Sequence, residues 1–191
     1  PDGVLVIAPG GDDTLYSVPR ADRSTPGFFT DRRYGELWVG PRMGLRDTST
    51  LLGVRTAPLD DLGAVLKEAA EDGRVRVLRG FDAAVDDVIT VPDDDRDVEL
   101  ASALAELRLI KDDHEVSCLQ QAIDATVLGF EDVVRSLPDA RHHGERWVEG
   151  TFNRRARSEG NDVGYDTIAA CGHHACTLHW IRNDGPVRSD D

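Results

Sequence analysis

A long amphipathic pattern in the C-terminal half of the chain restricts residues 112–137 to very few structures. Seven apolar residues recur there at intervals of three or four, the spacing of one helix face: Val116, Leu119, Ile123, Val127, Phe130, Val134 and Leu137. Asp112, with Glu115 three residues later, resembles the capping arrangement that opens a helix. The sequence therefore predicts an amphipathic helix that opens at Asp112 or Asp113 and stops at Pro138.

Further helices are predicted on both sides of this segment. The first covers about residues 98–110, with a stripe of leucines on one face, and the second covers residues 144–159. Residues 167–171 and 176–180 then favour two strands, with Gly172 at the bend between them.

The first ninety residues predict an α/β domain, because segments with the alternation of a strand are mixed with one that has helical spacing. The expected elements are a hairpin of residues 2–9 and 14–20, a loop over 21–35, a short extended piece and turn over 36–44, a helix over 58–72 and a half-buried strand over 74–79. An acidic, proline-bearing run at residues 91–97 marks a candidate boundary. We expect an N-terminal α/β domain over residues 1–92 and a second domain over residues 93–191.

Charge and composition exclude several classes of function. The chain has 22 Lys and Arg against 36 Asp and Glu, a net charge of −14, so it would on balance repel nucleic acid. No apolar run approaches the ~20 residues that cross a membrane, and no signal segment opens the chain. The three cysteines are an odd number, which favours reduced thiols. We expect a cytoplasmic protein that binds neither nucleic acid nor membrane.

Both ends of the chain look cut. It starts at Pro1 rather than at a methionine and leads almost at once into a predicted strand, and it ends on Asp191 without a closing element. We therefore expect an incomplete piece of a two-domain enzyme, with its first strands missing.

A cluster of cysteines and histidines lies near the C-terminal end, at Cys171, His173, His174, Cys176 and His179. A zinc site is one interpretation, since Cys and His are the usual zinc ligands. In an extended segment, however, Cys171, His173 and His179 would share one face while the other two residues point away. We favour the alternative in which the small cysteines pack in a sheet and some histidines are incidental.

His179 is a separate candidate, because it lies late in a predicted strand beside Trp180 and before a polar turn. That position suits a residue that handles protons or anchors a substrate. A structural histidine with satisfied hydrogen bonds is the alternative interpretation, and the residues by themselves favour it.

Two segments of the C-terminal half resemble the pita-bread metallopeptidases. The first has the pattern Arg-x-x-Lys followed by Glu and a mid-helix Ala, at Arg108, Lys111, Glu115 and Ala122. The second has a Tyr, Ile and Gly that lead into Leu-His-aromatic and Asn, at Tyr165, Ile168, Gly172, Leu178, His179, Trp180 and Asn183. The loop with Glu36, Leu37 and Trp38 is similar to the N-terminal domain of Xaa-Pro aminopeptidases in particular.

This resemblance implies a fold and an activity. The fold would be a creatinase/prolidase-like α/β domain followed by the first part of an α+β pita-bread catalytic domain. The activity would be that of an exopeptidase that removes the residue before a proline, with two divalent metal ions, commonly manganese, and a homo-oligomeric parent, a dimer or tetramer. The metal ligands of the family lie after the Leu-His-aromatic motif. We therefore expect no metal bound by this chain, and no activity from it alone.

The same resemblance gives roles to two residues. His179 would hydrogen-bond the Xaa-Pro peptide substrate and the tetrahedral intermediate, and would bind no metal. Trp38 would approach an active site across a subunit interface, with an ordinary half-buried tryptophan as the alternative. Prolidase, which cleaves dipeptides, and the metal-free creatinase share the fold, and a non-catalytic peptide-binding module on it is a further possibility.

Overall fold

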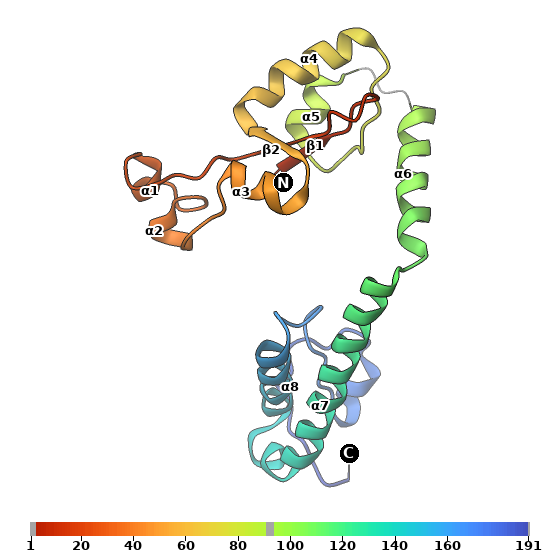
Figure 1. The fold of residues 1–191 in the computed structure, drawn as a ribbon. Helices are drawn as coiled ribbons and strands as arrows, with labels where there is room; N and C mark the ends of the chain where they lie inside the picture. Colours follow the sequence, from red (N-terminus) through yellow and green to blue (C-terminus); the bar gives the residue numbers. More distant parts are fainter. Residues whose placement is uncertain (1–2, 91–93, 191) are drawn as a thin grey trace. The chain divides into compact units, whose positions relative to one another are not determined.

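The computed structural model describes residues 3–90 and 94–190 of the chain (Figure 1). It has a mixed α/β architecture, as the sequence predicts, and divides into two compact units, Pro1–Arg108 and Leu109–Asp191. The domain boundary predicted at residues 92 and 93 lies outside the described residues and stays a prediction. The two units are described separately.

The first unit is built on a three-stranded sheet with the order β1-β2-β3. Strands β1 (Gly3–Val6) and β2 (Thr14–Ser17) pair antiparallel, with Val4 opposite Tyr16, which confirms the predicted hairpin. Strand β3 (Arg55–Pro58) pairs parallel with β2, and Ala57 lies opposite Tyr16. The sequence pattern did not predict β3.

Six helices and a 3-10 turn accompany this sheet among the described residues of the first unit: α1 (Gly27–Thr30), α2 (Glu36–Val39), α3 (Leu45–Leu52), η1 (Leu59–Asp61), α4 (Leu62–Asp72), α5 (Ala83–Val88) and α6 (Asp94–Leu109). The helices predicted over 58–72 and 98–110 correspond to α4 and α6. The loop predicted over 21–35 contains α1, and the extended piece predicted at residue 36 is wrong, because α2 begins there.

Tyr16 of the central strand lies at the middle of the first hydrophobic core. It belongs to one cluster with buried residues of α4, of the segment between α4 and α5, of α5 and of the position just after α5: Leu62, Leu66, Val77, Val85 and Ile89. Removing this apolar surface from water holds the two helices against the sheet.

The strand predicted over residues 74–79 does not form, although its alternation is real. Val75 and Val77 are turned inward while Arg74 and Arg76 are exposed. The backbone N–H of Val77 donates a hydrogen bond of 2.7 Å to the carboxylate of Asp97 instead of to a neighbouring strand. Because this backbone N–H is bound to a side chain, the segment does not form the ladder of backbone hydrogen bonds that defines a strand.

In the second unit, helices α7 (Asp113–His143) and α8 (Glu145–Glu159) pack against each other. The predicted capping box is confirmed: the Glu115 N–H donates to the Asp112 carboxylate at 2.8 Å, and the Asp112 N–H to the Glu115 carboxylate at 2.9 Å. The predicted stop at Pro138 is wrong, because α7 continues to His143. Ala140, beyond the proline, is completely buried, and its packing favours continuation of the helix although proline lacks the N–H of a helical hydrogen bond.

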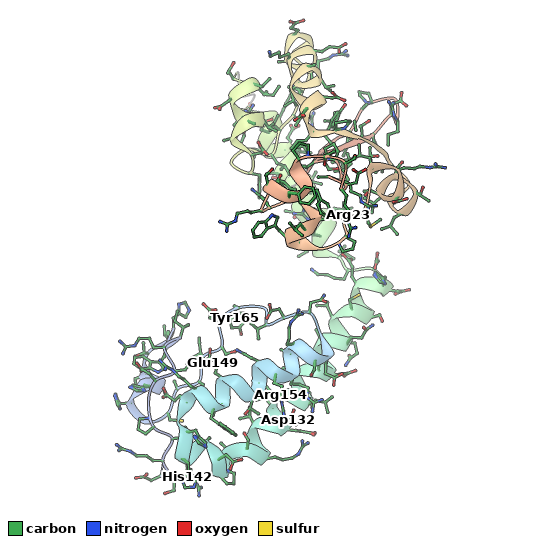
Figure 2. The ribbon with its side chains drawn as sticks, turned by 90° about the vertical axis from the view of Figure 1, so that its left-hand side faces the viewer. Arg23, Asp132, His142, Glu149, Arg154 and Tyr165 are labelled. Carbon is green, nitrogen blue, oxygen red and sulfur yellow. The ribbon has the colours of Figure 1, made fainter. Side chains whose placement is uncertain are left out.

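Contacts between α7 and α8 are both apolar and ionic. The rings of Phe130 and Phe152 meet edge to face at 5.4 Å. Asp132 of α7 is nearly buried and is 2.7 Å from a guanidinium nitrogen of Arg155, with Arg154 4.0 Å away (Figure 2). The hydrogen bond from Arg155 is the main reason that the pKa of Asp132 is lowered.

The two strands predicted over 167–180 are wrong. The segment has no regular structure apart from a 3-10 turn, η2 (Gly172–Cys176), and no strand occurs within residues 94–190. Its backbone groups bind the buried side chains of Glu145 and Asn183, as described below.

Candidate functional site

The candidate site forms around Glu145, the first residue of α8. Its side chain is completely buried. Each of its carboxylate oxygens accepts two hydrogen bonds, and all four donors come from the segment that follows α8: the Cys171 N–H (2.9 Å), His174 Nδ1 (2.9 Å), the Trp180 indole N–H (2.9 Å) and the Gly185 N–H (2.8 Å). One carboxylate therefore gathers fifteen residues of irregular chain around itself.

These donors also decide the charge of Glu145. Burial by itself raises the pKa of the carboxyl, but the four hydrogen bonds together lower it to about 2. Glu145 is therefore ionised at neutral pH, and its negative charge is balanced by N–H dipoles rather than by water.

Asn183 is the second buried polar residue of the site and is also completely buried. Its Oδ1 accepts from the Ala169 N–H at 2.9 Å, and its Nδ2 donates to the Thr167 carbonyl at 2.8 Å. Asn183 has a backbone φ of 45°, a left-handed conformation in which asparagine is favoured among non-glycine residues. Asn183 therefore connects its own part of the segment to the backbone of residues 167–169.

Aromatic contacts complete the packing inside the segment. The ring of His174 stacks on that of Trp180 with 3.8 Å between centroids, and the Arg182 guanidinium lies 4.2 Å from the Trp180 ring centroid. Gly185 allows this close packing, because a Cβ at its position would meet the His174 ring at 2.4 Å. The site tolerates no side chain there.

His179, the predicted catalytic residue, lies between the residues that bind Glu145 and has an exposed side chain. Its carbonyl accepts a hydrogen bond from the Ile181 N–H at 3.0 Å, which tightens the turn. The imidazole is thus displayed at the surface by a backbone that is fixed on both sides. It can donate or accept a hydrogen bond there.

Glu145 and His174 are the residues that sequence reasoning missed. Glu145 was not singled out, and His174 was considered only as a member of the Cys/His cluster. The sequence signals are weak. A glutamate at the first turn of a helix is common, and Glu145 and His174 lie 29 positions apart in the sequence, so no local pattern indicates that they meet.

The Cys/His cluster does not assemble as a metal site. Among the described residues, no group of three or more His, Cys, Asp or Glu side chains could hold a metal ion. The rings of His173 and His174 lie 4.2 Å apart, but His174 is bound to Glu145. The face assignment predicted from an extended segment fails because η2 turns the chain.

Trp38 lies on α2 in the first unit, and its side chain is 51% exposed. Its indole N–H donates to the Phe29 carbonyl at 2.8 Å, and the Arg32 guanidinium is 5.0 Å from its ring centroid. The loop around it is fixed by Glu36, whose carboxylate binds Arg20 at 2.6 Å and the Arg42 N–H at 2.8 Å. The ring is therefore held in place while part of its surface stays open.

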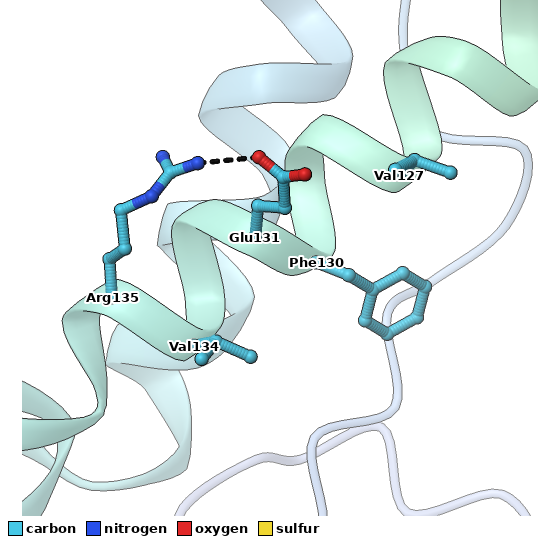
Figure 3. Close-up of a pocket in the computed structure, with 5 residues that line it drawn as sticks. All are labelled: Val127, Phe130, Glu131, Val134 and Arg135. Atoms are coloured by element: carbon cyan, nitrogen blue, oxygen red, sulfur yellow. Dashed lines mark hydrogen bonds and ion pairs between the residues drawn. The ribbon is translucent and has the colours of Figure 1, made fainter.

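A shallow apolar groove runs along α7, lined by Val127, Phe130, Glu131, Val134 and Arg135 (Figure 3). The Glu131 and Arg135 side chains form an ion pair of 2.5 Å at its edge. It has no convergent polar groups of the kind that orient a small ligand, so it is not part of the candidate site. No described helix is long and apolar enough to cross a membrane.

Comparison with known proteins agrees with the resemblance inferred from the motifs. No protein-family model matches the chain. Over its whole length the chain is 52% identical to Xaa-Pro aminopeptidase 1 of Streptomyces coelicolor and to the protein of the same name in Streptomyces lividans, and 47% identical to Xaa-Pro aminopeptidase 2 of S. coelicolor. It spans 39% of the length of the first two relatives and 41% of the third.

The chain is a homologue of Xaa-Pro aminopeptidases over the residues that it covers. The predicted resemblance to that family is confirmed.

Proposed function

We propose that this protein removes the N-terminal residue from peptides that have proline in the second position. The observation that carries the proposal is the 52% identity, along the entire chain, to a protein named Xaa-Pro aminopeptidase 1. Because the chain spans 39% of that relative, the activity is proposed for the complete natural polypeptide. The finer fold, a creatinase/prolidase-like domain followed by part of a pita-bread domain, is part of the same proposal.

His179 is proposed to hydrogen-bond the substrate carbonyl and the tetrahedral intermediate. This role follows from its match to the Leu-His-aromatic motif, and its exposed side chain on a fixed backbone supports it. An imidazole N–H aimed at the position where negative charge develops stabilises the transition state more than the ground state.

Trp38 is proposed to contact substrate from a neighbouring subunit of a homo-oligomer. Its half-exposed ring, held by Phe29 and Arg32, supports this role because an ordered aromatic surface loses little entropy on binding.

The resemblance also implies two divalent metal ions, and the residues present do not fit them. The described residues contain no set of three or more potential ligands in one place. No catalytic step is therefore assigned to a metal through this chain.

Hydrolysis of two peptides by the complete polypeptide tests the function. We expect release of the first residue from a tripeptide Xaa-Pro-Yaa and much slower cleavage of a dipeptide Xaa-Pro. Preference for the dipeptide would indicate a prolidase instead. Binding of the tripeptide without turnover would indicate a non-catalytic module.

Substitution of His179 tests the role of the site. His179→Ala should lower kcat by roughly 10²–10³-fold, because one transition-state hydrogen bond is lost, while the metal content of the protein is unchanged. His142→Ala, at the exposed end of α7 (Figure 2), is the matched control and should leave kcat unaltered. Equal turnover in wild-type and His179→Ala protein would remove His179 from the mechanism.

A further inference from the structure

The contacts of Glu145 surround the proposed catalytic histidine along the chain. Two of its four hydrogen-bond donors, at Cys171 and His174, precede His179, and two, at Trp180 and Gly185, follow it. The indole of Trp180 belongs to the residue directly after His179. Residues that bind the Glu145 carboxylate therefore lie on both sides of His179 in the sequence, at His174 and at Trp180.

The carboxylate is fully used by these donors. Oε1 accepts from a backbone N–H and an imidazole, and Oε2 accepts from an indole and a backbone N–H, at 2.8–2.9 Å. A carboxylate has about four lone-pair sites, so Glu145 has no acceptor left for another role. Its complete burial also separates it from any bound peptide.

His179 has the opposite surroundings, because its own side chain is exposed. The position of its imidazole is consequently set by its backbone and by the residues that fix that backbone. Catalytic groups must be held to about 0.5 Å of their productive position, and a displacement of about 1 Å can cost roughly 100-fold in rate.

We propose that Glu145 is a positioning residue for His179, acting through Trp180 and the Gly185 and Cys171 backbone to hold the histidine where it meets substrate. This inference rests on the proposed function of His179. Glu145 touches neither substrate nor reacting atoms and is not itself a catalytic residue.

Glu145→Gln is a sharp test because it keeps the shape of the side chain and replaces one acceptor oxygen by a donor amide. On the Oε2 side the new amide meets two N–H groups, neither of which can accept. On the Oε1 side it still meets the Cys171 N–H. Either orientation leaves at least one backbone donor without its acceptor, so the turn must shift.

The experiment is a double-mutant cycle in the complete polypeptide, with an Xaa-Pro-Yaa tripeptide as substrate. Glu145→Gln should lower kcat by roughly 10–100-fold with KM nearly unchanged. In a His179→Ala background the same substitution should change kcat less than about twofold, because residues that act as a unit are not additive. An equal fold-loss in both backgrounds would overturn the proposal and leave Glu145 a general stability residue.

Two variants support this cycle. Glu149→Gln, one turn along α8 (Figure 2), removes the same charge from a residue that accepts none of these four hydrogen bonds, and it should have no effect on kcat. If Glu145→Gln does not fold, Trp180→Phe removes one donor and keeps Glu145 charged. It should lower kcat by a smaller factor that again disappears in the His179→Ala background, and a factor that persists there would overturn the proposal.

A readout independent of activity separates this inference from the proposed function. Nitrogen-15 NMR of the indole and imidazole groups should show shifts of Trp180, His174 and His179 in Glu145→Gln and none in Glu149→Gln. If wild-type protein cleaves no Xaa-Pro peptide, the proposed function fails while these shifts still support the positioning. Unchanged His179 signals in Glu145→Gln would overturn the positioning, whatever the activity.

Discussion

Glu145 and Asn183 are polar side chains that the protein buries completely, and each binds the backbone of the segment that carries His179. Removing such groups from water is costly unless every donor and acceptor finds a partner. Here the partners belong to a segment that has no regular structure apart from η2. The two residues therefore replace a sheet ladder as the support of this segment.

The charge of Glu145 predicts how stability depends on pH. The folded pKa of about 2 lies below the ordinary value of 4.5, so the contribution is complete above pH 4.5. As pH falls from 4.5 toward 2, the unfolded state binds a proton that the folded state does not, and stability is lost. The difference in unfolding free energy between wild type and Glu145→Gln should shrink by about 1.4 kcal/mol per pH unit in this window.

Urea unfolding followed by circular dichroism at several pH values measures this difference. Other carboxylates with lowered pKa, such as Asp97 and Asp132, are common to both proteins and cancel. A difference that stays constant from pH 5 to pH 2.5 would contradict ionisation of Glu145 in the folded state.

Helices α7 and α8 form the framework on which that segment folds. They approach closely at Gly129, where a Cβ would lie 2.8 Å from the ring of Phe152. The apolar stripe of α7 is far less covered: Val127 is 52% exposed, Phe130 62% and Val134 64%. The predicted apolar stripe of α7 is therefore largely exposed within the described residues.

A methyl group at Gly129 should push the two helices apart. Gly129→Ala is expected to lower the free energy of unfolding by about 1–3 kcal/mol, as overpacking does in other cores. Gly150→Ala on α8 is the matched control, because no atom lies within 4 Å of its Cβ position, and it should stabilise the protein by up to about 1 kcal/mol. Thermal unfolding measures both, and equal shifts of Tm in the same direction would contradict the close approach.

At the scale of the whole molecule, the chain consists of two compact units with separate supports. The first unit includes α6 because Asp97 binds both the Val77 N–H and the Arg79 side chain, at 2.7 and 2.8 Å. Burial raises the pKa of Asp97, but these hydrogen bonds outweigh it and lower the pKa. This buried carboxylate connects α6 to the core around Tyr16.

Asp97→Ala should therefore lower the local stability of the first unit and leave that of the second unit unchanged. We expect faster hydrogen exchange of the Val77 and Ile89 amides, because Val77 loses its acceptor and Arg79, which also binds the Ile89 carbonyl, loses the nearer of its two carboxylate partners, Asp97 and Asp86. The Gly185 amide, bound to Glu145 in the second unit, should keep its protection. Asp95→Ala, at an exposed position of the same helix, serves as the control. Equal loss of protection in both units would contradict separate supports.

Sequence patterns by themselves determined four helices of this protein, α4, α6, α7 and α8, and its first hairpin. The capping box of Asp112 and Glu115, the periodicity of α4, α6, α7 and α8, and the pairing of β1 with β2 depend on residues close in the sequence. The Leu-His-aromatic motif and the Glu-Leu-Trp loop also indicated the resemblance to Xaa-Pro aminopeptidases without structural information. These features are local or are carried by residue identity, so a linear pattern is enough to show them.

Only the tertiary structure decided the arrangement of the candidate site. Residues 74–79 and 167–180 have the alternation of strands, but their backbone donors bind Asp97, Glu145 and Asn183 instead of a neighbouring strand. Glu145 meets its partners across 26 to 40 positions of sequence. Such contacts leave no periodic signal, because they form only after α8 and the following segment have packed, and burial then makes each unpaired donor costly.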